Sequence, residues 1–382
     1  MSTDSSLRME TLAVHGVAGL DTQTGALHQP LYLSTTYQRD DDGEYSRGYI
    51  YSRLGNPNRK TLEDTLAKLE HGACGLCFAS GLAAFSAMLQ ALETGDHVIF
   101  PHDMYFGGKH LVQYNWQRWG LTWTSVDMTE PDNVRDALRP NTKMIWMETP
   151  SNPLITIIDL QAIADIARAA GALTVCDSTL GTPVLQNPLT LGIDVVMHST
   201  TKYINGHSDV LGGALVFAQD GPVAERVRVI QEQGGAVPSP FDCMLIMRGL
   251  QTMPLRVREQ CATALKLSHY LHDHPAIDNV YYPGLTSHPQ HELAKRQMSA
   301  YGAMASILIH GDEKDAFEMM SRLKVFVQAT SLGGTHSKIE HRFSVEGEQT
   351  QAAPNLLRVS FGIEHIDDLR EDLEQALAGF ND

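Results

Sequence analysis

From about residue 60 onward, short apolar runs alternate with amphipathic stretches of helical spacing, and this alternation restricts the possible folds more than any other feature. Such alternation is typical of right-handed crossovers and of a mostly parallel sheet covered by helices. The pattern predicts helices over residues 61–70, 81–93, 105–119 and 160–170, and strands over 98–101, 121–126, 143–148, 173–176 and 194–197. The fold class that we expect is therefore α/β.

The pattern changes near residue 245, where a second region begins. It predicts one long helix over 254–271, strands over 304–309, 325–327 and 356–360, and a last helix over 366–378. A chain of 382 residues is also too long for a single hydrophobic core. We therefore expect an N-terminal arm (1–50), a larger domain (51–245) and a smaller α+β domain (246–382).

Composition argues against several classes of partner. The net charge of -16 disfavours nucleic acid, whose phosphates an acidic surface repels. No apolar stretch approaches the ~20 residues that a membrane span needs, and the N-terminus lacks the pattern of a secretory signal. Five cysteines fit reduced thiols in a cytoplasm. Cys74 and Cys77 form a lone CxxC without two further ligands, so we expect no metal site.

Small residues open the helix expected over 81–93. The run from Ala79 to Ala83 lets backbone N–H groups approach an anion, and the positive end of the helix favours the same ligand. A phosphate would suit this position. Close packing at a helix start is the alternative reading of the same residues.

A carboxylate, Asp177, directly follows the strand expected over 173–176. Ligands of α/β proteins bind just past the carboxyl ends of such strands. A buried carboxylate needs a partner, and a pyridinium nitrogen would serve, because the ion pair keeps the ring protonated and electron-withdrawing. The alternative is a simple helix cap at the turn after the strand.

A lysine, Lys202, lies in the hydroxyl-rich segment 198–203 after the strand expected over 194–197. Burial lowers the pKa of a lysine and so favours the free amine that forms imines. Ser199 and Thr201 can offer hydroxyls to a phosphate. A surface position is the common fate of lysine. Together, a phosphate cradle, a partner for a ring nitrogen and an imine-forming amine indicate pyridoxal 5'-phosphate (PLP).

The sequence resembles a known family, the Cys/Met-metabolism PLP enzymes, from about residue 11 to the C-terminus. This family includes cystathionine γ-synthase, the cystathionine lyases, methionine γ-lyase and the O-acylhomoserine sulfhydrylases. The matching segments are 51–59 (YSRLGNPNR), 78–81 (FASG), 95–97 (GDH), 148–153 (ETPSNP), 198–203 (HSTTKY), 282–285 (YPGL), 331–334 (SLGG) and 357–364 (LRVSFGIE).

The resemblance implies a type I PLP-dependent transferase fold and a homotetramer whose active sites are shared between subunits. It implies Lys202 as the Schiff-base lysine and proton shuttle, and Asp177 as the partner of the pyridinium nitrogen. For the phosphate it implies Gly81, Leu82, Ser199 and Thr201, with Tyr51 and Arg53 reaching the site of a neighbouring subunit. It also implies Tyr105 stacked on the cofactor ring and assisting departure of the leaving group, and Asn152, Ser331 and Arg358 around the substrate carboxylate or the cofactor.

Several positions depart from the family pattern. His336 stands where many synthases and lyases carry a glutamate, and a histidine suits the distal ammonium of cystathionine less well. Lys109 and His110 could favour a negatively charged acyl group, or could be polar rim residues. Phe106 stands where many methionine γ-lyases have a cysteine.

These departures favour γ-replacement on an O-acylhomoserine, the reaction of a cystathionine γ-synthase. The alternative within the family is α,γ- or α,β-elimination from cystathionine or methionine. A third hypothesis, from another class, is a catalytically silent protein that acts as a binding partner; the joint presence of Lys202, Asp177 and Arg358 argues against it.

Overall fold

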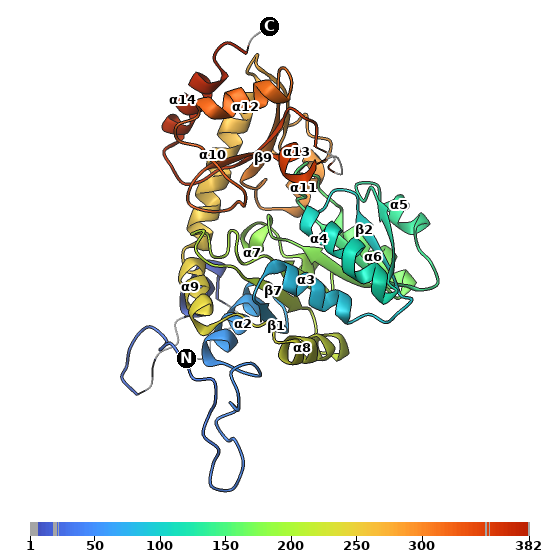
Figure 1. Cartoon of the computed structure of the whole chain (residues 1–382), viewed down its shortest axis with the longest axis vertical. Helices are drawn as coiled ribbons and strands as arrows, with labels where there is room; N and C mark the ends of the chain where they lie inside the picture. The colour runs from blue at the N-terminus through green and yellow to red at the C-terminus, as the bar shows by residue number, and fades with distance from the viewer. Residues whose placement is uncertain (1–6, 18–20, 22, 348–349, 351, 381–382) are drawn as a thin grey trace.

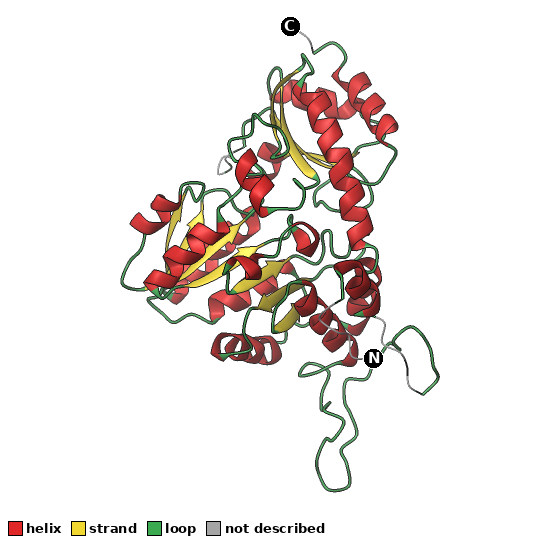
Figure 2. Ribbon diagram, turned by 180° about the vertical axis from the view of Figure 1, so that it is seen from behind, coloured by secondary structure: helices red, strands yellow, loops and turns green. Residues whose placement is uncertain are grey.

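Two β-sheets organise the chain in the computed structural model, and Figures 1 and 2 show them in two separate regions. The structure describes residues 7–17, 21, 23–347, 350 and 352–380. The larger sheet has the order β1-β7-β6-β5-β4-β2-β3, in which β7 runs antiparallel to both neighbours and the other pairings are parallel. Its strands are β1 (Cys74–Phe78), β2 (His97–Pro101), β3 (Thr122–Val126), β4 (Thr142–Glu148), β5 (Leu173–Asp177), β6 (Val195–His198) and β7 (Gly213–Phe217).

The larger sheet is apolar on both faces because helices cover both. Successive strand residues point to opposite faces, and in β4 the side chains of Met144 and Trp146 pack on one side while those of Ile145 and Met147 pack on the other. Helices α3 (Gly81–Gln90) and α8 (Pro222–Gly234) cover the first face. On the opposite face lie α2 (Pro57–Leu69), α5 (Pro131–Asp136), α6 (Leu160–Ala170) and α9 (Pro240–Leu250). This arrangement confirms the expected α/β class.

The smaller sheet, in the upper part of Figure 1, has the order β10-β11-β12-β9-β8. Its strands are β8 (Ile277–Tyr281), β9 (Met304–Ile309), β10 (Val327–Gln328), β11 (Lys338–His341) and β12 (Leu356–Ser360). One face packs on α10 (Met253–His272), α12 (Glu313–Arg322) and α14 (Ile366–Leu377). The other face carries polar side chains, and Ser306 on it donates a hydrogen bond of 2.6 Å to the carbonyl of Pro153 in the larger region. This polar face therefore looks onto the larger sheet's loops.

The structure differs from the sequence-based expectations in several places. The helix expected over 105–119 is broken: α4 (Phe106–Leu111) passes into a π-turn (Val112–Trp116) and a 3₁₀ turn (Gln117–Trp119). The strand expected at 325–327 begins only at Val327. Residues 9–15, expected in an arm, form α1 (Met9–His15), whose Leu12 and Ala13 are buried. The other short helices among the described residues are α7 (Thr182–Leu185), a 3₁₀ turn (Pro188–Leu191), α11 (His291–Gln297) and α13 (Arg342–Glu346).

The division of the chain into an arm and two domains stays a prediction, and position 245 falls inside α9. Within the described residues, no helix combines the length and the apolar character that crossing a membrane requires.

Candidate active site

Two carboxylates end neighbouring strands of the larger sheet. Glu148 is the last residue of β4, Asp177 is the last of β5, and the two are directly paired in the sheet register. Burial, countered by hydrogen bonds from Thr179, raises the pKa of Asp177; burial and the neighbouring Asp177 raise that of Glu148 well above its usual value. A cation bound beside Asp177 would relieve this repulsion, which is what a protonated pyridine nitrogen offers.

Asp177 is held by the turn that follows it. Its Oδ1 accepts hydrogen bonds from the backbone N (3.0 Å) and Oγ1 (2.5 Å) of Thr179. The same Thr179 hydroxyl accepts a bond of 2.8 Å from the backbone N of Ser199, on the loop after β6. Thr179 therefore fixes the carboxylate and the hydroxyl-rich loop relative to each other.

The N-terminus of α3 lies against that loop. A Cβ atom placed on Gly81 would lie 3.0 Å from the Cβ of Ser199 and 3.1 Å from its Oγ, so a larger residue here would press on Ser199. Ser80 caps the helix by accepting from the backbone N of Ala83, whereas the amides of Gly81 and Leu82 and the hydroxyl of Ser199 donate to no described residue. Unengaged donors at a helix N-terminus form an anion site.

Thr201 is placed differently from Ser199. Its Oγ1 donates to the carbonyl of Gly212 (3.2 Å) and accepts from the Gly212 amide (3.0 Å). This hydroxyl is therefore already engaged in closing the loop from β6 to β7, although the residue lies in the expected segment.

Lys202 is half-buried and reaches the smaller region. Its Nζ donates a hydrogen bond of 2.7 Å to Oγ of Ser331. Burial, together with the cations of Arg358 and Lys338, lowers its pKa from the usual 10.5 to about 8. A fraction of this amine is therefore neutral near physiological pH, as imine formation requires.

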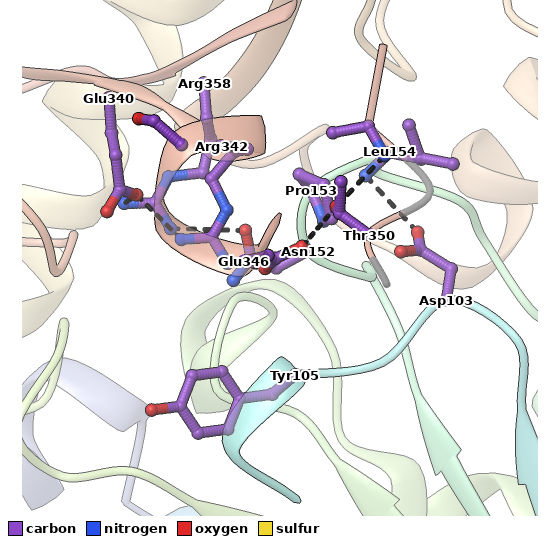
Figure 3. Close-up of polar contacts among 12 residues, drawn as sticks. Asp103, Tyr105, Asn152, Pro153, Leu154, Glu340, Arg342, Glu346, Thr350 and Arg358 are labelled. Carbon is purple, nitrogen blue, oxygen red and sulfur yellow. Dashed lines mark hydrogen bonds and ion pairs between the residues drawn. The ribbon is translucent and has the colours of Figure 1, made fainter. Parts of the chain in front are cut away.

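Arg358 of β12 lies in a buried network of charges, drawn in Figure 3 above the ring of Tyr105. Its guanidinium donates to the carbonyl of Ser331 (2.7 Å) and to Oδ1 of Asn152 (3.3 Å), and pairs with Glu340 at 2.5 Å. The structure thus brings together Asn152, Ser331 and Arg358, the three residues expected around a substrate carboxylate.

Tyr105 stands at the start of α4 with 45% of its surface exposed. Its backbone N donates a hydrogen bond of 2.7 Å to Oε2 of Glu148. The buried Glu148 carboxylate therefore sets the position of the Tyr105 ring near the ends of β4 and β5.

Tyr51 and Arg53 lie elsewhere on the single chain. Arg53 donates to the carbonyl of Glu232 near the end of α8, and its guanidinium lies 5.5 Å from the centre of the Tyr51 ring. Neither makes a hydrogen bond or ion pair with Lys202 or Asp177.

The residues present fit PLP. A strand-end carboxylate with a raised pKa can meet the ring nitrogen, an amine with a lowered pKa can form the Schiff base, and the unengaged donors at Gly81, Leu82 and Ser199 can hold the phosphate. These three groups lie at the carboxyl edge of the larger sheet, on or just after the ends of β1, β5 and β6.

Sequence reasoning missed several residues that support the site. Glu148 gave the same signal as Asp177, a carboxylate at the end of an apolar strand, and could have been found. Thr179, Glu340 and Lys338 gave no signal, because their roles arise from contacts between segments far apart in the sequence.

Comparisons with known proteins identify the family and its cofactor. A sequence model described as "Cys/Met metabolism PLP-dependent enzyme" matches residues 10–378. The chain is 44% identical over 373 residues to the cystathionine gamma-synthase of Mycobacterium tuberculosis, covering 96% of each protein. It is 41% identical over 378 residues to the cystathionine beta-lyase of Coxiella burnetii, covering 97% of each.

Among solved structures, the chain is similar to cystathionine gamma synthase from Xanthomonas oryzae pv. oryzae in complex with aminoacrylate and cysteine, with a TM-score of 0.94, 39% identity and coverage of 97% and 98%. It is equally similar to cystathionine gamma-lyase from Lactobacillus plantarum complexed with L-serine, with a TM-score of 0.94, 36% identity and coverage of 98% and 99%. The expected resemblance and fold are thereby confirmed.

Proposed function

Because the chain belongs to the Cys/Met-metabolism PLP-dependent enzymes, we propose that it catalyses γ-replacement on an O-acylated homoserine, joining a thiol to the γ-carbon. The observation that carries the proposal is the convergence of Lys202, Ser331 and Arg358, with Nζ of Lys202 bonded to a residue whose carbonyl also binds Arg358. The amine that the substrate's amino group would displace and the guanidinium that would bind its carboxylate thus both contact Ser331.

PLP, when bound, supplies an aldehyde for Schiff-base formation and a ring that withdraws electrons from the substrate's α-carbon. Asp177 would hold the ring nitrogen in its protonated form, and Thr179 fixes the orientation of that carboxylate. Gly81, Leu82 and Ser199 would hold the phosphate, and Thr201 would join them by turning its hydroxyl away from the Gly212 carbonyl. The ring of Tyr105 would stack on the cofactor, and its hydroxyl would assist departure of the γ-substituent.

Arg358 would bind the substrate carboxylate through its planar fork, which matches a carboxylate with two parallel hydrogen bonds. Asn152 orients the guanidinium from one side and Glu340 from another. The carboxylate thereby fixes the direction in which the α-carbon faces Lys202.

With the cofactor bound, Lys202 as a free amine would take the proton from Cα, deliver it to the bound cofactor, and then take one from Cβ, so that the γ-substituent can leave with its bonding electrons. One flexible amine within reach of both carbons serves both steps. Its lowered pKa keeps it available as a base near neutral pH.

Replacement is favoured over elimination by His336. This residue is exposed, and its Nδ1 lies 3.3 Å from Oγ1 of the neighbouring Thr335. A histidine there offers no fixed negative charge for the distal ammonium of cystathionine, the group that a dedicated cystathionine lyase must hold. Elimination from cystathionine or methionine, the reaction of a lyase, is the alternative that the following test distinguishes.

A substrate panel tests the proposal. Keto acid, ammonia and thioether products are measured from O-succinylhomoserine, O-acetylhomoserine, cystathionine and methionine, with and without cysteine or sulfide. We expect a thioether or thiol product from an O-acylhomoserine only when the thiol is added. Rapid cleavage of cystathionine with no product from either O-acylhomoserine would reject replacement in favour of elimination.

We further propose a homotetramer with shared active sites, in which Tyr51 and Arg53 reach the phosphate of a neighbouring subunit. The segment before α2 supports this, because it exposes apolar side chains, among them Leu27 at 82% and Leu33 at 69%. Refolding Arg53→Ala and Lys202→Ala chains together, so that mixed oligomers form, tests this arrangement. Each variant alone should be nearly inactive, whereas mixed oligomers should regain activity; no gain on mixing would contradict shared sites.

We also propose that the enzyme works in the cytoplasm. All five cysteines are unpaired, and four of them are buried, which suits a reducing compartment. Fractionation of cells that express the chain would check this location.

A further inference from the structure

One strand of the smaller sheet carries charged residues towards the site. In the antiparallel pairing of β11 with β12, Lys338 is opposite Ser360 and Glu340 is opposite Arg358. Directly paired residues of an antiparallel sheet share a face, and Ile339, between the two charged residues, packs into the apolar core on the other face. Lys338 and Arg358 are therefore on the same polar face.

The charges of this face do not balance. Arg358 pairs with Glu340, and Arg342 pairs with both Glu340 and Glu346. Two guanidinium groups and two carboxylates thus neutralise each other. The ammonium of Lys338 adds a further positive charge with no carboxylate partner among the described residues.

Lys338 is an unusual lysine because it is buried, with 9% of its surface exposed. Its one hydrogen bond to a described residue runs from Nζ to Oγ of Ser208, at 3.1 Å, and a hydroxyl carries no charge. Burying a charge without a counter-ion is costly. A bound anion next to this face would remove that cost.

We propose that Lys338 is a specificity-determining residue that supplies the positive charge for the substrate's α-carboxylate, because Glu340 already neutralises Arg358. This inference deepens the proposed function and rests on it. Arg358 provides the directional fork, and Lys338 provides the net charge. Without Lys338, the arrival of a carboxylate would leave the buried cluster with an excess negative charge.

The electrostatic environment of Lys202 agrees with separate roles for Arg358 and Lys338. Burial and the cation of Arg358 lower the pKa of Lys338. Burial, Arg358 and then Lys338 lower the pKa of Lys202, while Glu340 raises it and Arg342 lowers it further. Lys338 is therefore close enough to act on groups in the site, although it makes no hydrogen bond with Lys202.

Two replacements of Lys338, one neutral and one charged, separate the effect of its charge from that of its hydrogen bond. Lys338→Gln keeps a hydrogen-bond donor for Ser208 but removes the charge, and Lys338→Arg keeps the charge. Lys314→Gln, on the exposed side of α12, is the matched control. The PLP-loaded proteins are titrated with glycine, which has a carboxylate, and with methylamine, which lacks one, and the change in visible absorbance gives each apparent Kd.

The ratio of the two Kd values isolates recognition of the carboxylate. We expect Lys338→Gln to weaken the binding of glycine relative to that of methylamine by about tenfold, the effect of one nearby charge. In Lys338→Arg and Lys314→Gln the ratio should stay within about twofold of the wild-type ratio.

A second readout does not depend on any substrate. Loss of the Lys338 cation should raise the pKa of Lys202, so the pH midpoint for capture of PLP by the cofactor-free protein should move upward in Lys338→Gln and stay unchanged in Lys338→Arg. A wild-type ratio and midpoint in Lys338→Gln, or equal losses in the Gln and Arg variants, would overturn the inference. A wild-type protein without any PLP absorbance would overturn the proposed function, and this inference with it.

Discussion

Lys202 Nζ and Ser331 Oγ are joined by a hydrogen bond of 2.7 Å between the loop after β6 and the segment before β11. The two residues lie 129 positions apart in the chain. Ser331 adopts a left-handed backbone with φ of 71°, uncommon for a residue with a side chain. The smaller sheet region therefore contributes directly to the placement of the amine.

Removing the Ser331 hydroxyl should slow turnover while leaving cofactor binding intact. Ser331→Gly suits the left-handed backbone and deletes the hydroxyl, so we expect kcat to fall by about tenfold, the order of one lost hydrogen bond to a charged group. Ser331→Ala lacks the same hydroxyl and should have the same kcat as Ser331→Gly. Its Tm should be lower than that of Ser331→Gly, because the left-handed conformation disfavours alanine. Wild-type kcat in both variants would show that this bond has no role in turnover.

Thr179 should control the affinity for PLP. Thr179→Val removes the hydroxyl that donates to Asp177 and accepts from Ser199, and we expect the Kd of PLP to rise by about tenfold or more. Thr179→Ser keeps the hydroxyl and should stay near the wild type. Equilibrium titration of the cofactor-free variants with PLP, followed by absorbance, measures both values; equal affinities for Val and Ser would refute the assignment.

Arg358 should act on the substrate and not on the cofactor. Arg358→Ala should raise the apparent KM of the amino-acid substrate by about a hundredfold, as loss of a buried bidentate partner does, with an unchanged visible spectrum. Arg358→Lys keeps the charge but loses the fork, so its KM should lie between those of Ala and wild type. A collapsed cofactor spectrum in Arg358→Ala would mean that this arginine holds PLP.

Acid should destabilise the larger sheet through His97. Its ring nitrogens lie 2.8 Å from Oγ1 of Thr142 and 2.9 Å from Oγ1 of Thr124, and burial together with Arg139 lowers its pKa to about 4. The unfolded chain takes up this proton first, near pH 6.5, so the stability that neutral His97 provides is lost as the pH falls from 6.5 towards 4. The Tm of the wild type should therefore fall more steeply over that range than the Tm of His97→Gln. Parallel slopes would contradict the lowered pKa.

Much of the fold could be predicted because its strands are apolar and end in recognisable polar residues. The sequence pattern ends the expected strands just before Asp177 and Lys202; the structure makes Asp177 the last residue of β5 and places Lys202 on the loop after β6. Strand β1 escaped prediction because Gly75 interrupts a short run. In that strand a Cβ on Gly75 would lie 2.5 Å from the Glu63 carbonyl, so close packing on α2 explains the glycine.

The charged part of the site could not be predicted from local pattern. Strand β11 holds Lys338, Glu340 and His341 among four residues, a composition typical of exposed segments, yet all three are buried. Each is buried against a distant segment: Arg358 pairs with Glu340 across the sheet, Ser208 accepts from Lys338, and the Pro354 carbonyl lies against the ring of His341. The break after α4 was missed for a related reason: the sequence carries helical spacing through Trp119, but the backbone widens into a π-turn at Val112.

The central claim is that Lys202 carries PLP as a Schiff base, and covalent trapping tests it most directly. The purified protein is loaded with PLP, reduced with borohydride, digested, and searched by mass spectrometry for the pyridoxyl group. The account predicts that the group is found on Lys202, and that Lys202→Ala shows neither this modification nor the visible imine band. Stoichiometric modification of another lysine, or an unchanged imine band in Lys202→Ala, would contradict it.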